Sequence, residues 1–161
     1  MNGNFFALMF RMKYINRWGL MRSSRQENLS EHSLECMVLA HALAMIGNKK
    51  FNKKYDINKI ALKAAYHDSP EIITGDMPTP IKYFSKSMRQ SYEVVEADAI
   101  NKLLFLLPEE YEEEYKQLYI YTQEEKIIIK AADKLCAYIK CLDEINSGNN
   151  EFKSALKSTE E

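Results

Sequence analysis

The stretch from residue 60 to residue 71 reads Ile60-Ala61-Leu62-Lys63-Ala64-Ala65-Tyr66-His67-Asp68-Ser69-Pro70-Glu71. On a helix, His67, Asp68 and Glu71 fall in the sector of the apolar residues, whereas Lys59 and Lys63 lie on the opposite side. A carboxylate and an imidazole on a buried face are costly unless something compensates for their lost hydration. A divalent metal ion would do so, because it binds both groups directly. The alternative is a pair of buried polar side chains that satisfy each other.

Length and charge limit the classes of protein to which this chain can belong. Its 161 residues suit one domain and can bury a substantial core. The formal net charge is -1, so no global field attracts nucleic acid or an anionic membrane. No apolar run is long enough to cross a bilayer, and the first residues lack the basic leader and cleavage site of a signal peptide. We therefore expect neither nucleic acid nor a membrane as a partner.

The cysteines indicate the redox compartment. Cys36, Cys136 and Cys141 are an odd number of thiols and include no CxxC pair. We expect reduced thiols in a cytoplasmic protein rather than a disulfide framework.

Apolar residues recur at helical spacing along almost the whole chain, and no run of strand length alternates. The predicted helices cover residues 4–15, 29–47, 57–70, 82–107, 109–119, 123–146 and 150–158. There is no internal repeat and no long linker. The sequence therefore predicts an all-α protein in which residues 1–161 form a single-domain helical bundle.

Several helix ends carry their own signals. Asp56 can cap the helix at 57–70, and Thr122 with Glu125 forms a capping box for the helix at 123–146. Gly148 lies where that last helix should stop. Proline and glycine residues between 69 and 80 predict a rigid loop.

Two helices show where the core should lie. The helix at 29–47 is apolar around nearly its whole circumference, so we expect it in the middle of the bundle. His32 and His41 both point inward on it, and each could be a metal ligand or a structural core histidine. On the helix at 123–146, Asp133 lies off the main apolar stripe and is expected to be half-exposed. That stripe consists of Ile128, Ala131, Leu135, Tyr138, Ile139 and Leu142.

The order His32, His67-Asp68, Asp133 matches the H…HD…D pattern of the HD-domain metal-dependent phosphohydrolases. More closely, the chain resembles the bacterial HD-domain 5′-deoxynucleotidases of the YfbR type over about residues 5–153. The matching stretches are Ile15-Asn16-Arg17-Trp18, Glu27-Asn28-Leu29-Ser30-Glu31-His32-Ser33, Tyr66-His67-Asp68, Glu71, Gly75-Asp76-Met77-Pro78-Thr79-Pro80-Ile81-Lys82-Tyr83-Phe84, Ala132-Asp133-Lys134-Leu135-Cys136-Ala137-Tyr138 and Gly148-Asn149-Asn150-Glu151-Phe152. The resemblance implies a bundle of the HD-domain type.

The resemblance also implies a metal site. Its ligands would be His32, His67, Asp68 and Asp133, and three of these, His32, Asp68 and Asp133, would also contact the substrate. Two imidazoles and two carboxylates suit Co²⁺, Mn²⁺, Zn²⁺ or Ni²⁺ better than Mg²⁺. We expect one such ion.

Further residues are assigned by similarity to this family. Glu71 would be the general base or would orient the attacking water, and Arg17 would grip the phosphate. Trp18 would pack against the sugar, where its bulk can reject a 2′-hydroxyl. The loop Asp76-Met77-Pro78-Thr79 would contact the nucleoside, with Asp76 near the 3′-hydroxyl.

Each assignment has a plainer alternative. Glu71 could be a helix-terminal residue in solvent, Arg17 a surface arginine, Trp18 a core or lid anchor and Asp76 a helix cap. His41 is interpreted as a core residue. We interpret Lys82, Lys130 and Lys134 and the acidic run at 109–114 as solvated.

The chain departs from the family pattern in two places. Ser69-Pro70 follows His67-Asp68 where small residues without proline are more usual, so Glu71 could lie at a kinked helix end. Members of the family continue through another helical segment, so we expect a naturally short form or a truncated C-terminus.

The predicted activity is metal-dependent hydrolysis of deoxyribonucleoside 5′-monophosphates by a cytoplasmic homodimer. One alternative is another HD-domain hydrolase, either a triphosphohydrolase or a phosphodiesterase. Only Arg17, Arg22 and Arg25 cluster near the predicted site, which is few for a longer phosphate chain. The other alternative is an inactive helical binding protein that contains a structural metal.

Overall fold

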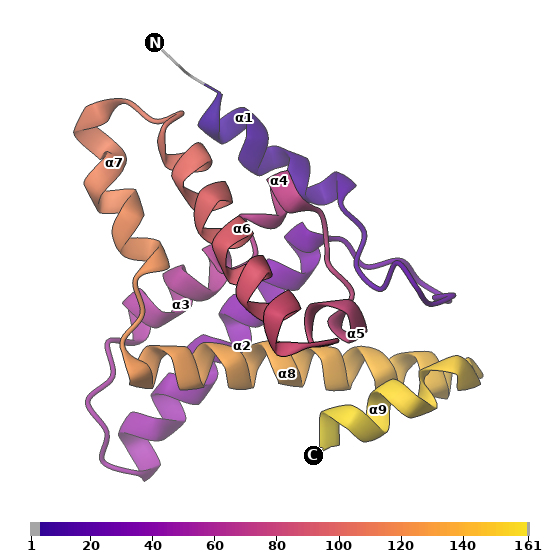
Figure 1. The fold of residues 1–161 in the computed structure, drawn as a ribbon. Coiled ribbons are helices and arrows are strands. Elements are labelled where there is room, and N and C mark those ends of the chain that lie inside the picture. The colour runs from indigo at the N-terminus through magenta and orange to yellow at the C-terminus, as the bar shows by residue number, and fades with distance from the viewer. Residues whose placement is uncertain (1–3, 161) are drawn as a thin grey trace.

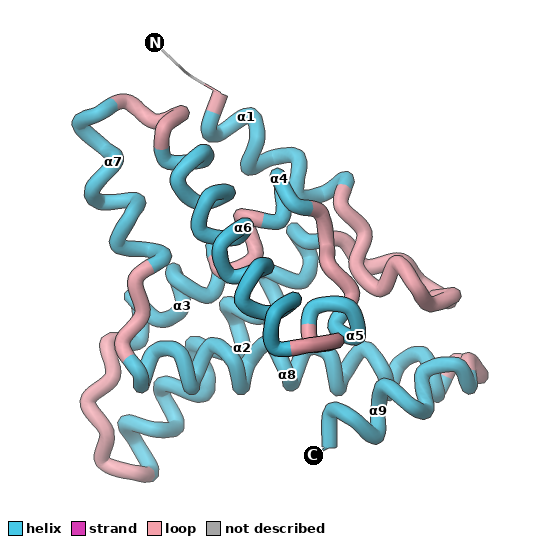
Figure 2. The backbone as a smooth tube through the Cα atoms, in the orientation of Figure 1, coloured by secondary structure: helices cyan, strands magenta, loops and turns pink. Residues whose placement is uncertain are grey.

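The computed structural model describes residues 4–160, so Met1–Gly3 and Glu161 lie outside the described residues. Its α-helices are α1 Phe5–Met9, α2 Leu29–Lys50, α3 Ile57–Tyr66, α4 Glu71–Thr74, α5 Thr79–Lys82, α6 Lys86–Leu104, α7 Glu109–Lys116, α8 Gln123–Asn146 and α9 Lys153–Glu160. Short 3₁₀ turns follow α1 (Phe10–Tyr14) and α7 (Gln117–Tyr119) and precede α9 (Asn150–Phe152). Within the described residues no strand is present, and Figure 2 shows only helices and loops. The predicted all-α class is confirmed.

Helices α2, α3 and α8 form the main core. Figure 1 shows α8 crossing α2, with α9 alongside α8. Small residues, among them Ala40, Ala64 and Ala132, are fully buried where these three helices meet. A second cluster joins Phe5 of α1 to Leu103 and Leu104 of α6. Small side chains let the helix backbones approach closely, and this brings the C-terminal end of α3 and the middle of α8 near the start of α2.

The helix caps predicted at Asp56 and Thr122 are present in the structure. The Asp56 side chain accepts a hydrogen bond from the backbone N–H of Lys59, and Thr122 with Glu125 forms a complete capping box. Asn28 and Glu31 form a second capping box, at the start of α2, which the sequence analysis did not identify.

The predicted helix over 57–70 is too long. α3 ends at Tyr66, and a turn covers residues 67–70 before α4 begins at Glu71. Pro70 has no N–H to donate to a helix and disfavours helical backbone at Ser69. Ser69 ends the helix by donating a hydrogen bond from Oγ to the carbonyl of Tyr66, at 2.7 Å. His67 and Asp68 therefore lie just beyond a helix end.

Other predicted boundaries are wrong in the proline-rich segment. The predicted loop over 69–80 contains α4 and the start of α5. The predicted helix over 82–107 is shorter, because Ser85 caps α6 by accepting a hydrogen bond from the N–H of Met88.

Lys63 is buried, although helical periodicity placed it opposite the apolar face. Only 2 % of its surface is exposed, and its Nζ lies 2.6 Å from Oε2 of Glu125 on α8 and also donates to the carbonyl of Ile120. An ion pair with satisfied donors offsets the desolvation of the ammonium group.

The apolar faces of α2 and α8 are also less buried than predicted. Leu34 and Val38 of α2 are 58 % and 56 % exposed, so this helix is not covered on all sides. On α8 the predicted stripe is only partly buried. Ile128 is buried, but Leu135 and Ile139 are exposed, and the buried face also includes Ile129, Ala132 and Cys136. Asp133 borders that buried face and is half-exposed, as predicted.

No helix within residues 4–160 is both long and apolar enough to cross a membrane. The three cysteines are buried and none forms a disulfide in the described part of the chain.

Glu144 ties the segment between α1 and α2 to the far end of α8. Its buried carboxylate accepts hydrogen bonds from the backbone N–H of Ser24 at 2.8 Å and of Arg25 at 3.3 Å. Lys140 and Asn149 donate to the same carboxylate, at 2.6 and 2.8 Å. Burial opposes ionisation of Glu144, but these donors prevail and hold its pKa far below the ordinary value of 4.5.

We expect Glu144→Gln to destabilise the fold by about 2 kcal/mol, because hydrogen bonds to a charged acceptor are lost. The lowered pKa means that this contribution is present above pH 4.5 and is lost as pH falls toward the folded-state pKa. Urea unfolding at pH 7 and at successively lower pH measures both effects. The curves of wild type and Glu144→Gln should converge on acidification. Asp143→Asn, on the same helix and exposed, is the control.

Candidate metal centre

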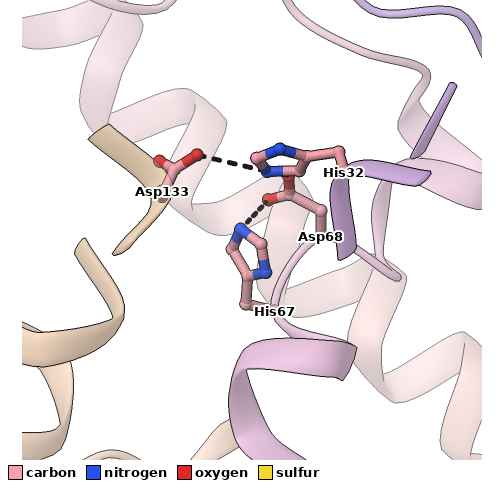
Figure 3. A group of neighbouring side chains, drawn as sticks. All are labelled: His32, His67, Asp68 and Asp133. Carbon is pink, nitrogen blue, oxygen red and sulfur yellow. Dashed lines mark ion pairs between the residues drawn. The ribbon is translucent and has the colours of Figure 1, made fainter. Parts of the chain in front are cut away.

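Four ionisable side chains from three parts of the fold converge on one point (Figure 3). His32 comes from the first turn of α2, His67 and Asp68 from the turn after α3, and Asp133 from α8. Nε2 of His32 lies 3.2 Å from an oxygen of Asp68 and 3.2 Å from an oxygen of Asp133. Nε2 of His67 lies 3.2 Å from the other oxygen of Asp68. One ligand atom from each residue lies within 4.8 Å of all the others.

The donor atoms of the two histidines suit a cation. Nδ1 of His67 lies 2.7 Å from the carbonyl oxygen of Ala64, so it carries the proton and leaves the Nε2 lone pair free. The Nε2 atoms of His32 and His67 are buried, and neither has a hydrogen-bond partner of good geometry among the described residues. Two imidazoles and two carboxylates around one point are a donor set that could hold a divalent transition metal ion.

The two carboxylates and two imidazoles of this group shift one another's pKa values. Burial opposes protonation of His32, but its contacts with Asp133 and Asp68 prevail and raise its pKa to about 11. Burial likewise opposes ionisation of Asp68, yet His67 and His32 hold its pKa well below 3.8. A positive charge is therefore favoured at the centre of the group.

Arg17 is part of this site rather than a surface arginine. Its side chain is 14 % exposed, and Nη1 lies 3.0 Å from Oδ2 of Asp68. Nη2 lies 3.9 Å from Oδ1 of Asp133, and Nε lies 3.0 Å from Oε1 of Glu27. Burial lowers the pKa of Arg17, but the charges of Asp68, Asp133 and Glu27 outweigh it. A planar cation thus faces the edge of the candidate metal site.

Glu71 is buried at the start of α4, so the alternative of a solvated helix end is wrong. It is 7 % exposed, and its Oε2 has no partner in the described part of the chain. Burial, followed by the negative charges of Asp68 and Asp76, raises its pKa to about 9. A carboxylate in such surroundings has a high proton affinity.

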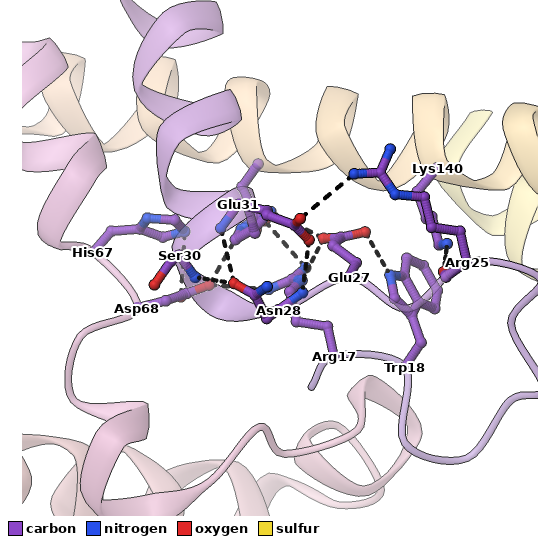
Figure 4. Close-up of polar contacts among 12 residues, drawn as sticks. Arg17, Trp18, Arg25, Glu27, Asn28, Ser30, Glu31, His67, Asp68 and Lys140 are labelled. Carbon is purple, nitrogen blue, oxygen red and sulfur yellow. Dashed lines mark hydrogen bonds and ion pairs between the residues drawn. The ribbon is translucent and has the colours of Figure 1, made fainter. Parts of the chain in front are cut away.

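Trp18 lies beside Arg17 and is held on two sides. Its Nε1 donates to Oε2 of Glu27 at 3.2 Å (Figure 4). Its ring centroid lies 5.3 Å from that of Phe152. Its backbone φ is 62°, a left-handed value that is uncommon for a bulky residue. Glu27, which contacts both Arg17 and Trp18, lies in one of the stretches that match the family but had no assigned role, because the sequence does not show which side chains it meets.

The predicted nucleoside-binding residues of the segment 76–79 lie outside the candidate metal group. Asp76, Met77 and Pro78 are half-buried and Thr79 is exposed. Burial raises the pKa of Asp76. The charge of Arg17 opposes this shift, and the charge of Asp68 adds to it.

The predictions for His41, for three lysines and for the acidic run of α7 have mixed outcomes. His41 is half-buried on α2 and lies outside the candidate metal group. Lys82 is half-buried with Nζ 4.3 Å from the ring centroid of Tyr92, so its predicted solvation is wrong. Lys130, Lys134 and the glutamates of α7 are exposed, as predicted.

We expect Zn²⁺ to bind this site with release of a proton, because the raised pKa of His32, about 11, keeps that residue protonated at pH 7. Affinity should therefore rise by about tenfold per pH unit in the neutral range. Calorimetric titration in two buffers of different ionisation enthalpy measures the release. Equal heats in both buffers would contradict it. Asp133→Asn should weaken binding, whereas Asp143→Asn should not.

Comparison with known proteins identifies the family. The family model described as 5′-deoxynucleotidase YfbR-like matches residues 4–161. The 5′-deoxynucleotidase of Cronobacter sakazakii is 49 % identical over 162 residues, which cover 97 % of this chain and 81 % of the relative. A 5′-deoxynucleotidase of Yersinia pseudotuberculosis is also 49 % identical, covering 97 % of this chain and 82 % of the relative.

Solved structures show the same fold. An HD-domain phosphohydrolase from Listeria innocua superposes with a TM-score of 0.86 at 21 % identity, covering 97 % of this chain and 76 % of the other. The HD phosphohydrolase DatZ of cyanophage S-2L, bound to dA and one catalytic Zn²⁺ ion, superposes with a TM-score of 0.65 at 21 % identity, covering 84 % of this chain and 69 % of the other. The chain therefore belongs to the YfbR-like 5′-deoxynucleotidase family and has the fold of the HD-domain phosphohydrolases.

Proposed function

We propose that this protein hydrolyses deoxyribonucleoside 5′-monophosphates to a deoxynucleoside and phosphate, with one divalent transition metal ion as cofactor. The observation that carries the proposal is the convergence of His32, His67, Asp68 and Asp133 beside a buried cation, Arg17, and a buried acid, Glu71. The names of the relatives support the substrate class.

The four converging residues would hold the ion. When bound, such an ion supplies Lewis-acid neutralisation of phosphoryl charge and lowers the pKa of coordinated water. Zn²⁺ is supported by the phage phosphohydrolase, and Co²⁺, Mn²⁺ and Ni²⁺ suit the same nitrogen and oxygen donors.

Arg17 would bind the phosphate dianion. Its Nη atoms already face the carboxylates at the edge of the site, so a phosphate there would meet two parallel N–H donors. The same contacts would stabilise charge on the phosphoryl oxygens as the reaction proceeds.

Glu71 would act as the general base. The charge of a bound ion would lower the pKa of Glu71 and favour its ionised form. Its buried oxygen, which has no partner among the described residues, would then accept a proton from the attacking water as the new oxygen–phosphorus bond forms. The bond from phosphorus to the 5′-oxygen then breaks, and the nucleoside leaves after taking up a proton.

Trp18 and the segment Asp76-Met77-Pro78-Thr79 would contact the nucleoside. Trp18 adjoins Arg17, so a sugar attached to a phosphate on Arg17 would lie near the indole ring. The bulk of that ring would disfavour a 2′-hydroxyl, and Asp76 would accept a hydrogen bond from the 3′-hydroxyl.

We expect Glu71→Gln to lower kcat by about 10²- to 10⁴-fold, the usual contribution of a general base. Arg17→Ala should lower kcat/KM by about 10²-fold, because a charge-assisted contact to phosphate is lost. Phosphate release from deoxyribonucleoside monophosphates measures both, with the bound metal determined in each sample. Glu112→Gln, on the exposed face of α7, is the matched control. Retained turnover in both site variants would refute the assigned roles.

A panel of substrates and metal ions separates the alternatives. Deoxyribonucleoside monophosphates should be hydrolysed faster than ribonucleoside monophosphates, and equal rates would count against the role of Trp18. Faster hydrolysis of triphosphates or cyclic nucleotides would indicate another HD-domain hydrolase. No turnover by folded, metal-loaded protein would indicate a binding protein.

We also propose a homodimeric, cytoplasmic protein. Leu34, Val38 and Ile139 are exposed and line one groove between α2 and α8, an apolar surface that a second copy would cover. The three buried, unpaired cysteines support a reducing compartment.

Light scattering after gel filtration should give the mass of a dimer for wild type. Val38→Lys should give a monomer, because it would place a charge inside the contact. Val94→Lys, equally exposed but on α6, should leave the mass unchanged. A wild-type monomer at all concentrations tested would refute the dimer.

A further inference from the structure

Glu27 lies beside the site without belonging to the candidate metal group. It precedes Asn28, the cap of α2, and its carbonyl accepts a hydrogen bond from the backbone N–H of Arg17 at 2.9 Å. Next to that contact, Asn16 pairs with Asn28 in an isolated antiparallel bridge, and Leu29 donates to the carbonyl of Ile15. The backbone therefore fixes Glu27 next to Arg17.

The carboxylate of Glu27 is shared between the neighbouring site residues. Oε1 lies 3.0 Å from Nε of Arg17, and Oε2 accepts from Nε1 of Trp18 at 3.2 Å. Oε1 also lies 3.6 Å from Nδ1 of His32, on the side of the ring away from the converging ligands. The side chain is only 12 % exposed, so these contacts are weakly screened by solvent. Figure 4 shows Glu27 between Arg17 and Trp18.

We propose that Glu27 is a positioning residue, whose single carboxylate sets the orientations of Arg17 and Trp18 relative to the metal site. This inference rests on the proposed function for its consequence in substrate selection. The placement of the two side chains rests on the contacts of Glu27 and does not depend on the proposed function.

The contact with Arg17 determines which guanidinium edge faces the site. Because Oε1 of Glu27 forms an ion pair on the Nε side of the guanidinium, the two Nη atoms remain on the side of Asp68 and Asp133. Without this contact the guanidinium could rotate about its long stem and would retain only its links to the ligand carboxylates.

The contact with Trp18 acts against local strain. A φ of 62° is strained for a bulky residue and persists only where several contacts enforce it. The indole N–H on Glu27 and the packing against Phe152 are two such contacts. Losing the first would let Trp18 move away from the position where it would meet the sugar.

Glu27→Gln tests the proposal with little change in shape. One amide oxygen replaces two carboxylate oxygens, so the donors on Arg17 and Trp18 can no longer each have a charged acceptor. Glu35→Gln, one residue before Cys36 on an exposed part of α2, removes a carboxylate nearby and is the control.

The first measurement requires no activity. Trp18 is the only tryptophan in the chain, so intrinsic fluorescence reports its surroundings directly. In Glu27→Gln we expect a red-shifted emission and stronger quenching by acrylamide than in wild type, at a temperature where circular dichroism shows the helices intact. Glu35→Gln should match wild type. Unchanged emission and quenching in Glu27→Gln would overturn the proposal.

The second measurement addresses selection of the substrate. Loss of the ion pair with Arg17 and of the charged acceptor for Trp18 should lower kcat/KM for deoxyribonucleoside monophosphates by about ten- to a hundredfold. The rise in KM should account for much of this loss, and the ratio of deoxy to ribo turnover should fall toward one. A lower melting temperature with unchanged KM and unchanged sugar preference would show a merely structural role and overturn the proposal.

The two measurements separate this inference from the proposed function. If wild type releases no phosphate but Glu27→Gln still exposes Trp18, the placement of Trp18 by Glu27 is supported and the proposed function is refuted. If wild type is active and selective and Glu27→Gln equals Glu35→Gln in every readout, the inference alone is refuted.

Discussion

The arrangement of the site depends on the contacts that the carboxylate of Asp68 makes. One of its oxygens lies 3.0 Å from Nη1 of Arg17 and 3.2 Å from Nε2 of His32, and the other lies 3.2 Å from Nε2 of His67. Taking a carboxylate out of water is costly, and here several positive or polarisable partners offset that cost together. Asp68 therefore links the segment before α2, the first turn of α2 and the turn after α3.

The core places these partners without contributing to the chemistry. Small residues such as Ala40, Ala64 and Ala132 let α2, α3 and α8 approach closely. The close approach brings one end of α3 to the first turn of α2, and Asp133 reaches the same point from the middle of α8. Glu144 holds the segment that follows Trp18 from the C-terminal end of α8, so the middle and one end of the same helix support one site.

Helix type and helix starts could be predicted from local sequence, because hydrophobic period and capping side chains act within a few residues. Asp56 and the Thr122–Glu125 box show this directly. Boundaries near proline were less accurate, because a short turn such as residues 67–70 has no periodicity of its own. The burial of Lys63 was missed, since its partner Glu125 lies on another helix.

The sequence by itself determined the class of fold and, through the order of the H…HD…D residues, the set of candidate ligands. Only the tertiary structure decided that Glu71 and Arg17 are buried beside those ligands and that Glu27 connects Arg17 to Trp18. The physical reason is the distance along the sequence over which each kind of interaction acts. Periodicity and capping depend on neighbours within one or two helical turns, whereas the charge environment of a side chain depends on segments that meet only when the helices pack.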